Sequence, residues 1–199
     1  MLPLFPLQTV LFPGGLLMLK VFEARYLDLV SRCLRGGSTF GVVCLRQGSE
    51  VGRSDGPVLF ESIGVQARIE DVDGEQAGIL KVRCLGLERF RLEGKPRQLA
   101  DGLWESATSP VEPDARRMPG PAVFETVKAL SNAIASLRER GQMPFAEPFR
   151  LDEAGWVANR WCELLPIPLS AKQKLMALED PVVRLSVVDG YLKDKQVVR

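Results

Sequence analysis

The side chains of this sequence that could carry out chemistry are four cysteines, a serine close to a lysine, and two pairs of carboxylates. Histidine is absent from all 199 residues, which removes the commonest general base, the commonest metal ligand and every imidazole-based triad. None of the cysteines belongs to a Cys-x-x-Cys pair, and each stands among apolar neighbours. This pattern predicts small core residues in a reducing compartment, and no zinc site, at Cys33, Cys44, Cys84 and Cys162.

A serine–lysine dyad or a carboxylate pair would need a defined geometry, and the sequence favours neither. Ser170 and Lys172 would point to different sides of a helix, and Ser170 suits a helix cap. Phosphate-binding glycine motifs, G-x-x-x-x-G-K-[ST] and G-x-G-x-x-G, are absent. Two carboxylate pairs lie beside expected turns and helix starts, as is typical of solvated side chains: Asp71 with Asp73, and Glu179 with Asp180. The sequence therefore predicts a protein that is not an enzyme and has no cofactor and no metal site.

Charge and hydropathy limit the kind of partner. The chain has 26 basic and 25 acidic side chains, and neither half has the basic excess that binding to nucleic acid or anionic membranes usually needs. The apolar start of the chain has no basic residue before Lys20, is broken by Pro3, Pro6 and Pro13, and is followed by no A-x-A cleavage site. We therefore expect neither a signal peptide nor a membrane span, and a soluble cytoplasmic protein without a membrane partner.

Strands must form most of the framework in the first half of the chain. Pro13-Gly14 predicts a type II turn, followed by a buried strand over residues 16–21. Alternating apolar and polar residues predict a hairpin over residues 63–84, with its turn at Asp73-Gly74. Short strands separated by turns predict a small, closed or nearly closed barrel over residues 1–110.

Helical periodicity appears once within this region and dominates the second half. At about residues 23–35, Leu27, Val30 and Leu34 share one helical face while Arg25 faces away, and Gly36-Gly37 ends the helix. Prolines predict a linker over residues 111–121, and apolar stripes predict a helical bundle over residues 122–199. Within the bundle we expect helix caps at Asp152, Ser170 and Asp180. We also expect Val183, Val187 and Tyr191 to share one helical face.

Three parts of the chain resemble the Lon-protease N-terminal domain family. The opening carries Leu2-Pro-Leu-Phe-Pro-Leu7, Val10-Leu-Phe-Pro-Gly14 and Phe22-Glu-Ala-Arg-Tyr26. The middle carries Gly86-Leu-Glu-Arg-Phe90, similar to the family's G-x-x-R-F segment. The last part carries Glu163-Leu-Leu-Pro-Ile-Pro-Leu-Ser-Ala-Lys-Gln173, followed by Asp180-Pro181 and Arg184-Leu185. The match spans nearly the whole chain in the family's order, and it resembles the stand-alone bacterial form of the domain, without the ATPase and peptidase parts.

The resemblance implies an α+β fold, with a PUA-like β pseudo-barrel followed by a C-terminal helical bundle. It also implies a non-catalytic module for recognising unfolded or tagged protein segments. The expected partner is then an unfolded or extended polypeptide. A separate protease, for which the chain would act as an adaptor, and a weak homodimer are left open.

The candidate binding residues each have a structural alternative. Phe22, Arg25 and Tyr26 begin the first helix and could border a groove for apolar side chains and a carboxylate, or could pin the helix to the barrel. Arg89, next to Phe90, has the same two interpretations. Phe145 lies between two expected helices, in a segment that could expose apolar side chains.

Two other functions remain open at this stage. PUA-like barrels elsewhere bind RNA, and a basic cluster gives that function some support, whereas the balanced charge opposes it. A small-molecule sensor that uses a cleft between barrel and bundle is the other alternative. The basic cluster consists of Arg83, Arg89, Arg91, Lys95 and Arg97.

Overall fold

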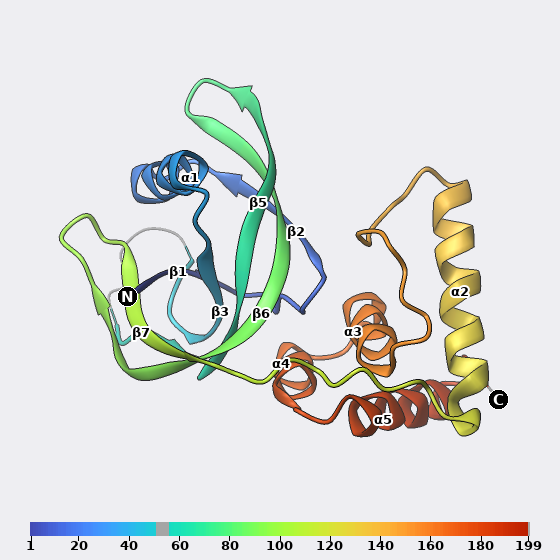
Figure 1. The fold of residues 1–199 in the computed structure, drawn as a ribbon. Coiled ribbons are helices and arrows are strands. Elements are labelled where there is room, and N and C mark those ends of the chain that lie inside the picture. The colour runs from blue at the N-terminus through green and yellow to red at the C-terminus, as the bar shows by residue number, and fades with distance from the viewer. Residues whose placement is uncertain (51–55, 199) are drawn as a thin grey trace. The chain divides into compact units, whose positions relative to one another are not determined.

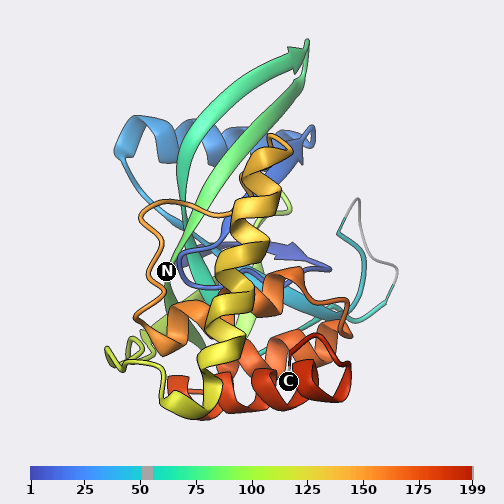
Figure 2. The ribbon, with the colours of Figure 1, turned by 90° about the vertical axis from the view of Figure 1, so that its right-hand side faces the viewer.

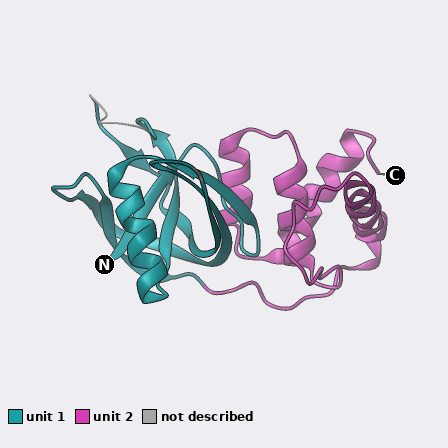
Figure 3. Ribbon diagram, turned by 90° about the horizontal axis from the view of Figure 1, so that it is seen from above, with its two compact units in different colours: residues 1–111 teal, residues 112–199 magenta. Residues whose placement is uncertain are grey.

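The structure, a computed structural model, describes residues 1–50 and 56–198. The chain forms two compact units, residues 1–111 (unit 1) and residues 112–199 (unit 2), which Figure 3 shows in different colours. Unit 1 consists of strands and one helix, and unit 2 of helices, so the chain has the predicted α+β fold class. None of the helices in the described residues has the length and apolar composition needed to cross a membrane.

Five strands of unit 1 close into a barrel. The strands of this unit are β1 (Leu2–Leu7), β2 (Leu16–Val21), β3 (Phe40–Gln47), β4 (Leu59–Phe60), β5 (Ile63–Gln76), β6 (Ile79–Gln98) and β7 (Trp104–Pro110). The order β1-β7-β6-β5-β3 is closed into a ring by parallel pairing between β1 and β3. β4 pairs with β3, and β2 pairs with β6 outside this ring (Figure 1). The pseudo-barrel predicted from the sequence is thereby confirmed.

Strand β6 holds the sheet together because it spans 20 residues. Its first part pairs with β2 and its second part with β7, while β5 pairs along its other edge. Phe90 of β6 forms a fully buried cluster with Leu4 and Val43. A Cβ on Gly64 would lie 2.6 Å from the Phe90 ring and 2.4 Å from the Val42 carbonyl oxygen, so this packing requires glycine.

The β5–β6 hairpin turns later than predicted. The Asp73-Gly74 pair lies within β5, where Gly74 pairs with Leu80 of β6. The turn is formed instead by Ala77 and Gly78, and Gly78 has the φ of 80° that glycine adopts without strain. The turn prediction was therefore wrong, because strand pairing continues through a dipeptide that is common in turns. In Figures 1 and 2 the resulting long hairpin extends beyond the other strands.

The helix of unit 1, α1 (Ala24–Gly36), ends as predicted but buries a different face. Gly37 ends it in the left-handed conformation, with φ of 60°. Leu34 is 54% exposed, whereas Arg25 is only 9% exposed. Arg25 is buried because its guanidinium donates a hydrogen bond to the Gly102 carbonyl at 2.9 Å and pairs with Glu23 at 2.9 Å. The prediction that Arg25 faces away from the protein was wrong.

Unit 2 is the predicted helical bundle. Its elements are the short 3-10 helix η1 (Pro121–Val123) and the helices α2 (Phe124–Glu139), α3 (Ala154–Leu164), α4 (Leu169–Ala177) and α5 (Pro181–Asp194). α3 contacts α2, α4 and α5, and its residues from Ala154 to Cys162 are all buried. α2 stands at a steep angle to α5 in Figures 1 and 2.

One of the three predicted helix caps in unit 2 is confirmed. Asp180 caps α5 by accepting hydrogen bonds from the next backbone N–H groups. α3 has Glu153 rather than Asp152 at its N-cap position, and α4 has Pro168 there, so Ser170 lies inside the helix. The caps predicted at Asp152 and Ser170 were therefore wrong, because both helices begin without a side-chain cap.

The buried face of α5 is set by an ion pair and differs from the apolar stripe seen in the sequence. Val183 and Val187 are 48% and 51% exposed, respectively. Arg184 is 1% exposed and holds Asp114 through two hydrogen bonds, of 2.6 Å and 3.0 Å. This ion pair attaches the irregular segment of residues 112–120 to α5. The buried apolar residues of the helix are Leu185, Val188 and Leu192.

Candidate functional site

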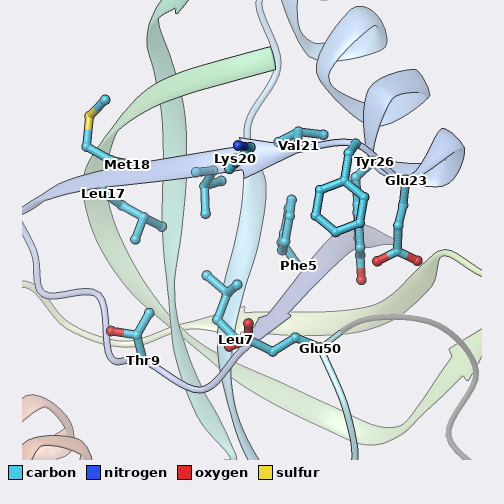
Figure 4. Close-up of a pocket in the computed structure, with 12 residues that line it drawn as sticks. Phe5, Leu7, Thr9, Leu17, Met18, Lys20, Val21, Glu23, Tyr26 and Glu50 are labelled. Carbon is cyan, nitrogen blue, oxygen red and sulfur yellow. The ribbon is translucent and has the colours of Figure 1, made fainter. Parts of the chain in front are cut away.

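A groove with a volume of about 450 Å³ follows β2 in unit 1. It is lined by residues of β2, by the start of α1 and by residues of β1 and the segment after it. In Figure 4, Phe5 and Leu7 of β1 point toward β2. Most of the surface that surrounds this space is therefore apolar side chain.

Strand β2 is fixed in place by the turn that precedes it. Gly14 has φ of 71°, and the Gly15 N–H donates to the Phe12 carbonyl at 2.9 Å, as a turn at Pro13-Gly14 requires. The Gly14 N–H donates to the Gly86 carbonyl, and the Gly86 N–H donates to the Gly15 carbonyl, each at 2.8 Å. A Cβ on Gly86 would lie 2.4 Å from the Phe12 oxygen, so the first residue of the G-x-x-R-F segment must be glycine for β2 to start here.

The outer face of β2 exposes Met18 and Lys20, and Phe22, directly after the strand, is exposed as well. Leu19 and Val21 are buried, whereas Met18 is 64% exposed and Phe22 is 47% exposed. The prediction of a buried strand was therefore right for one face only. The reason is that β2 lies outside the closed ring, where one of its faces has no covering element among the described residues. Exposed apolar side chains beside a groove are typical of a contact surface.

The groove is lined by three charged residues, Lys20, Glu23 and Glu50, and by Tyr26 of α1. The Tyr26 ring is buried and stacks on Phe5 with a centroid distance of 4.0 Å. Burial raises the pKa of Tyr26 to about 12; nearby Arg25 lowers it and the Glu23 and Glu50 carboxylates raise it further. Glu50 also accepts a hydrogen bond from the Gln8 N–H. In Figure 4, Glu23 lies beside Tyr26 at this end of the groove, whereas the Glu50 carboxylate lies beside Leu7.

The structure brings two of the predicted binding residues to the groove. Phe22 and Tyr26 line it. Arg25 lines a separate pocket of about 290 Å³, on the side of Gly102. Arg89 is 3% exposed and lies in the barrel. Phe145 lies in unit 2, and neither Arg89 nor Phe145 is among the described residues that line the groove.

Phe145 is part of the packing of unit 2. It is 4% exposed, and its ring meets Trp156 edge to face at a centroid distance of 6.3 Å. The guanidinium of Arg160 lies 5.7 Å from the ring centroid. Met143 of the same segment is 44% exposed, so the segment exposes an apolar side chain, but Phe145 is not the residue that does so.

Met18 and Glu50 line the groove but were not predicted from the sequence. Met18 and Phe22 alternate with the buried Leu19 and Val21 in the structure, but all four residues are apolar, so their types alone did not distinguish the exposed face from the buried one. Glu50 comes from the segment after β3, far along the chain from β2, and no local pattern pointed to it.

The four cysteines are buried, as predicted. Burial raises the pKa of Cys44 to about 11 and the pKa values of Cys84 and Cys162 to about 12, so these thiols are poor nucleophiles near neutral pH. In the part of the chain that the structure describes, no three cysteine or carboxylate side chains are grouped so that they could hold a metal ion.

The predicted basic cluster is divided by the fold. Arg89 is buried, whereas the other members of the cluster are exposed. One of these, Arg97, donates a hydrogen bond to Glu105 at 3.1 Å. The arrangement thus gives a weaker positive surface than the sequence indicated.

Comparison with known proteins gives one family. Residues 1–194 match the model of the ATP-dependent protease La (Lon) substrate-binding domain. The fold is similar to a Lon N-terminal domain protein from Xanthomonas campestris, with 35% identity, a TM-score of 0.76, and coverage of 96% of this chain and 97% of that chain. It is also similar to the N-terminal domain of a Mycobacterium avium complex Lon protease, with a TM-score of 0.63 over 97% of this chain and 98% of that chain. The second structure is only 16% identical and shows the fold alone. No protein of curated function matches the chain.

Proposed function

Because the chain belongs to the family of the Lon protease substrate-binding domain, we propose that it is a non-catalytic module that binds unfolded or extended polypeptide in the groove beside β2. The single observation that carries this proposal is the pair of exposed apolar side chains, Met18 and Phe22, on the rim of an apolar groove. Unfolded proteins differ from folded ones in exposing apolar side chains. Burial of these side chains in an apolar groove removes their surface from water, which favours binding.

The buried cysteines and the absence of histidine support a role in binding without catalysis. In this proposal the chain works in the cytoplasm and hands the bound polypeptide to a separate protease. The groove binds the polypeptide, and the separate protease cleaves it.

The proposal is tested by fluorescence anisotropy with a labelled, reduced and carboxymethylated model protein that cannot fold. The Met18→Ser/Phe22→Ser variant is expected to bind about tenfold more weakly or worse, because each large apolar side chain gains about 1.5–3 kcal/mol on full burial. Circular dichroism of each variant establishes that it remains folded.

Unit 2 supplies a matched control. The Val183→Ser/Val187→Ser variant removes two apolar side chains that are 48% and 51% exposed, respectively, on α5. It is expected to bind the unfolded protein within about twofold of the wild type, since general surface hydrophobicity is not the cause of binding. Wild-type binding no tighter than about 1 mM, or equal weakening by both double variants, would contradict the proposed function.

A further inference from the structure

At the start of α1, the side chain in the N-cap position takes part in an ion pair. Glu23 occupies this position, and its carbonyl accepts hydrogen bonds from the Tyr26 and Leu27 N–H groups, each at 2.9 Å. Its carboxylate pairs with the Arg25 guanidinium at 2.9 Å. The ion pair therefore helps to fix the point at which the chain passes from Phe22 into the helix.

The guanidinium of Arg25 also joins this helix start to the turn between β6 and β7. It donates a hydrogen bond to the Gly102 carbonyl at 2.9 Å. The turn is closed by the Leu99 N–H, which donates to the Leu103 carbonyl at 2.8 Å, and by the Gly102 N–H, which donates to the Leu99 carbonyl at 2.9 Å. Gly102 has φ of 86°, which glycine adopts without strain. The acceptor for Arg25 therefore belongs to a turn that is held by its own hydrogen bonds.

A third contact of Arg25 is with the Tyr26 ring. The central carbon of the guanidinium lies 4.6 Å from the ring centroid, within the range of a cation–π interaction. Phe5 stacks on the same ring. Tyr26 lines both the groove and the smaller pocket beside Gly102, whereas Arg25 is among the described residues that line the smaller pocket only. Arg25 thus contacts a residue of the groove wall without lining the groove itself.

Arginine suits this position because its planar guanidinium presents several N–H donors in a fixed geometry. Nη1 donates to the Gly102 carbonyl, and Nη2 pairs with the Glu23 carboxylate. Arg25 is 9% exposed, so these contacts are made largely away from water, where they are stronger. Lysine has one ammonium group on a flexible chain and cannot reproduce this arrangement.

We propose that Arg25 is a positioning residue for polypeptide binding, which holds Phe22 and Tyr26 at the groove without contacting the ligand. It acts through Glu23, which directly follows Phe22, and through the Tyr26 ring. Side chains that are already held in place lose less conformational freedom when a ligand binds, so the affinity is higher. This proposal rests on the proposed function of the groove and identifies the residue that organises one end of it.

The test compares two variants in the anisotropy assay with the carboxymethylated model protein. Arg25→Met keeps a long side chain, removes the charge and the donors, and is expected to weaken binding about fivefold to tenfold. Arg25→Lys keeps the charge and is expected to weaken binding about threefold, because the ammonium holds only one of the two acceptors well. Arg25→Lys carries the test if circular dichroism shows that Arg25→Met does not fold. Wild-type affinity in the folded variants would overturn the proposal.

A matched control comes from a second buried arginine of unit 1. Arg89 is 3% exposed and is not among the described residues that line the groove. Arg89→Lys makes the same chemical change as Arg25→Lys and is expected to bind the model protein within about twofold of the wild type. Equal weakening by both lysine variants would show a general effect of disturbing the barrel and would overturn the positioning role.

A double-mutant cycle with Phe22 gives a readout that a loss of stability would not move. If Arg25 acts through Phe22 and Tyr26, Arg25→Lys should weaken binding by a clearly smaller factor in the Phe22→Ser background than in the wild type. In 15N relaxation measurements, the amides of residues 22–27 should become more mobile in Arg25→Lys, while those of β5 keep their order. The same factor in both backgrounds, or a uniform loss of order in unit 1, would overturn the proposal.

Direct contact between Arg25 and carboxylates of the ligand is the competing explanation. A synthetic peptide of valine, phenylalanine and serine with blocked ends has no charge, and Arg25→Lys should weaken its binding by the same factor as that of the acidic model protein. An effect confined to the acidic ligand would overturn the proposal. If Met18→Ser/Phe22→Ser has no effect on binding, the proposed function itself fails. If that variant weakens binding and the Arg25 variants do not, only the positioning role fails.

Discussion

Replacement of Arg184 by methionine is expected to destabilise unit 2 strongly. The guanidinium donates two hydrogen bonds to the Asp114 carboxylate, one to the Asn159 side chain at 3.1 Å and one to the Leu175 carbonyl at 2.9 Å. It also donates to the Leu178 carbonyl. Methionine has similar length and fills similar volume, so the substitution tests the ion pair and hydrogen bonds more than the packing.

The expected cost follows from what the substitution leaves behind. Arg184 is 1% exposed, and the Asp114 side chain is 19% exposed, so the carboxylate would stay largely buried without its main counter-charge. Breaking a buried pair by removing one partner costs about 3–5 kcal/mol. The double variant Arg184→Met/Asp114→Asn is expected to recover part of this loss, because no buried charge then remains unpaired.

The assay is urea unfolding followed by tryptophan fluorescence in a Trp104→Phe background. Of the three tryptophans, Trp156 and Trp161 then remain, and both lie in unit 2. Arg138→Met is the control, since the Arg138–Glu147 pair of unit 2 has side chains that are 58% and 62% exposed, respectively, and its loss is expected to cost about 0–1 kcal/mol. An Arg184→Met cost as small as that of Arg138→Met would refute the reasoning.

Three further predictions concern a helix glycine, a carboxyl group and the thiols. Gly155→Ala should destabilise unit 2, because the new Cβ would lie 2.4 Å from an Asp114 carboxylate oxygen, and this clash should outweigh the helix preference of alanine over glycine, about 1 kcal/mol. Gly190→Ala has open space around the new Cβ and should stabilise unit 2 in the same urea assay. Burial raises the pKa of the Glu163 carboxyl from 4.5 to about 7, so its contribution to the free energy of unfolding should grow as pH falls from 7 to 4.5, and Glu163→Gln should remove that dependence from the pH series. All four cysteines should resist iodoacetamide in the native state at about pH 8 and react in urea, as followed by mass spectrometry; rapid native labelling would contradict their burial.

Much of the fold could be predicted because local patterns carry it. Strand alternation, the turn at Pro13-Gly14, the glycine at the end of α1 and the cap at Asp180 depend on neighbours in sequence, and all are confirmed. The family predicted from the three stretches is confirmed as well. The structure also gives a physical reason for two of those residues, since Gly86 must pass close to the Phe12 carbonyl and Arg184 must hold Asp114.

The predictions that were wrong depended on contacts between distant residues. Arg25 was expected to face away from the protein, and its burial requires the Gly102 carbonyl, 77 residues further along. The hairpin turn depends on how far β5 and β6 continue to pair, which the Asp73-Gly74 dipeptide does not determine.

Only some of the residues that line the groove were named from the sequence, for the same reason. Phe22 and Tyr26 belong to the stretch that resembles the family, and they do line the groove. Met18 was missed because its exposure depends on β2 lying outside the closed ring, a property of the strand order and not of residues 16–21 themselves. Glu50 reaches the groove only through the course of the chain after β3.

The most direct measurement of where a polypeptide binds is an NMR titration of the 15N-labelled full chain with the reduced, carboxymethylated model protein. If the groove beside β2 is the site, the largest amide shift changes will fall on residues 16–23, with further changes near Phe5, Leu7 and Glu50. Changes that cluster in unit 2, or an absence of changes at about 1 mM model protein, would contradict the central claim.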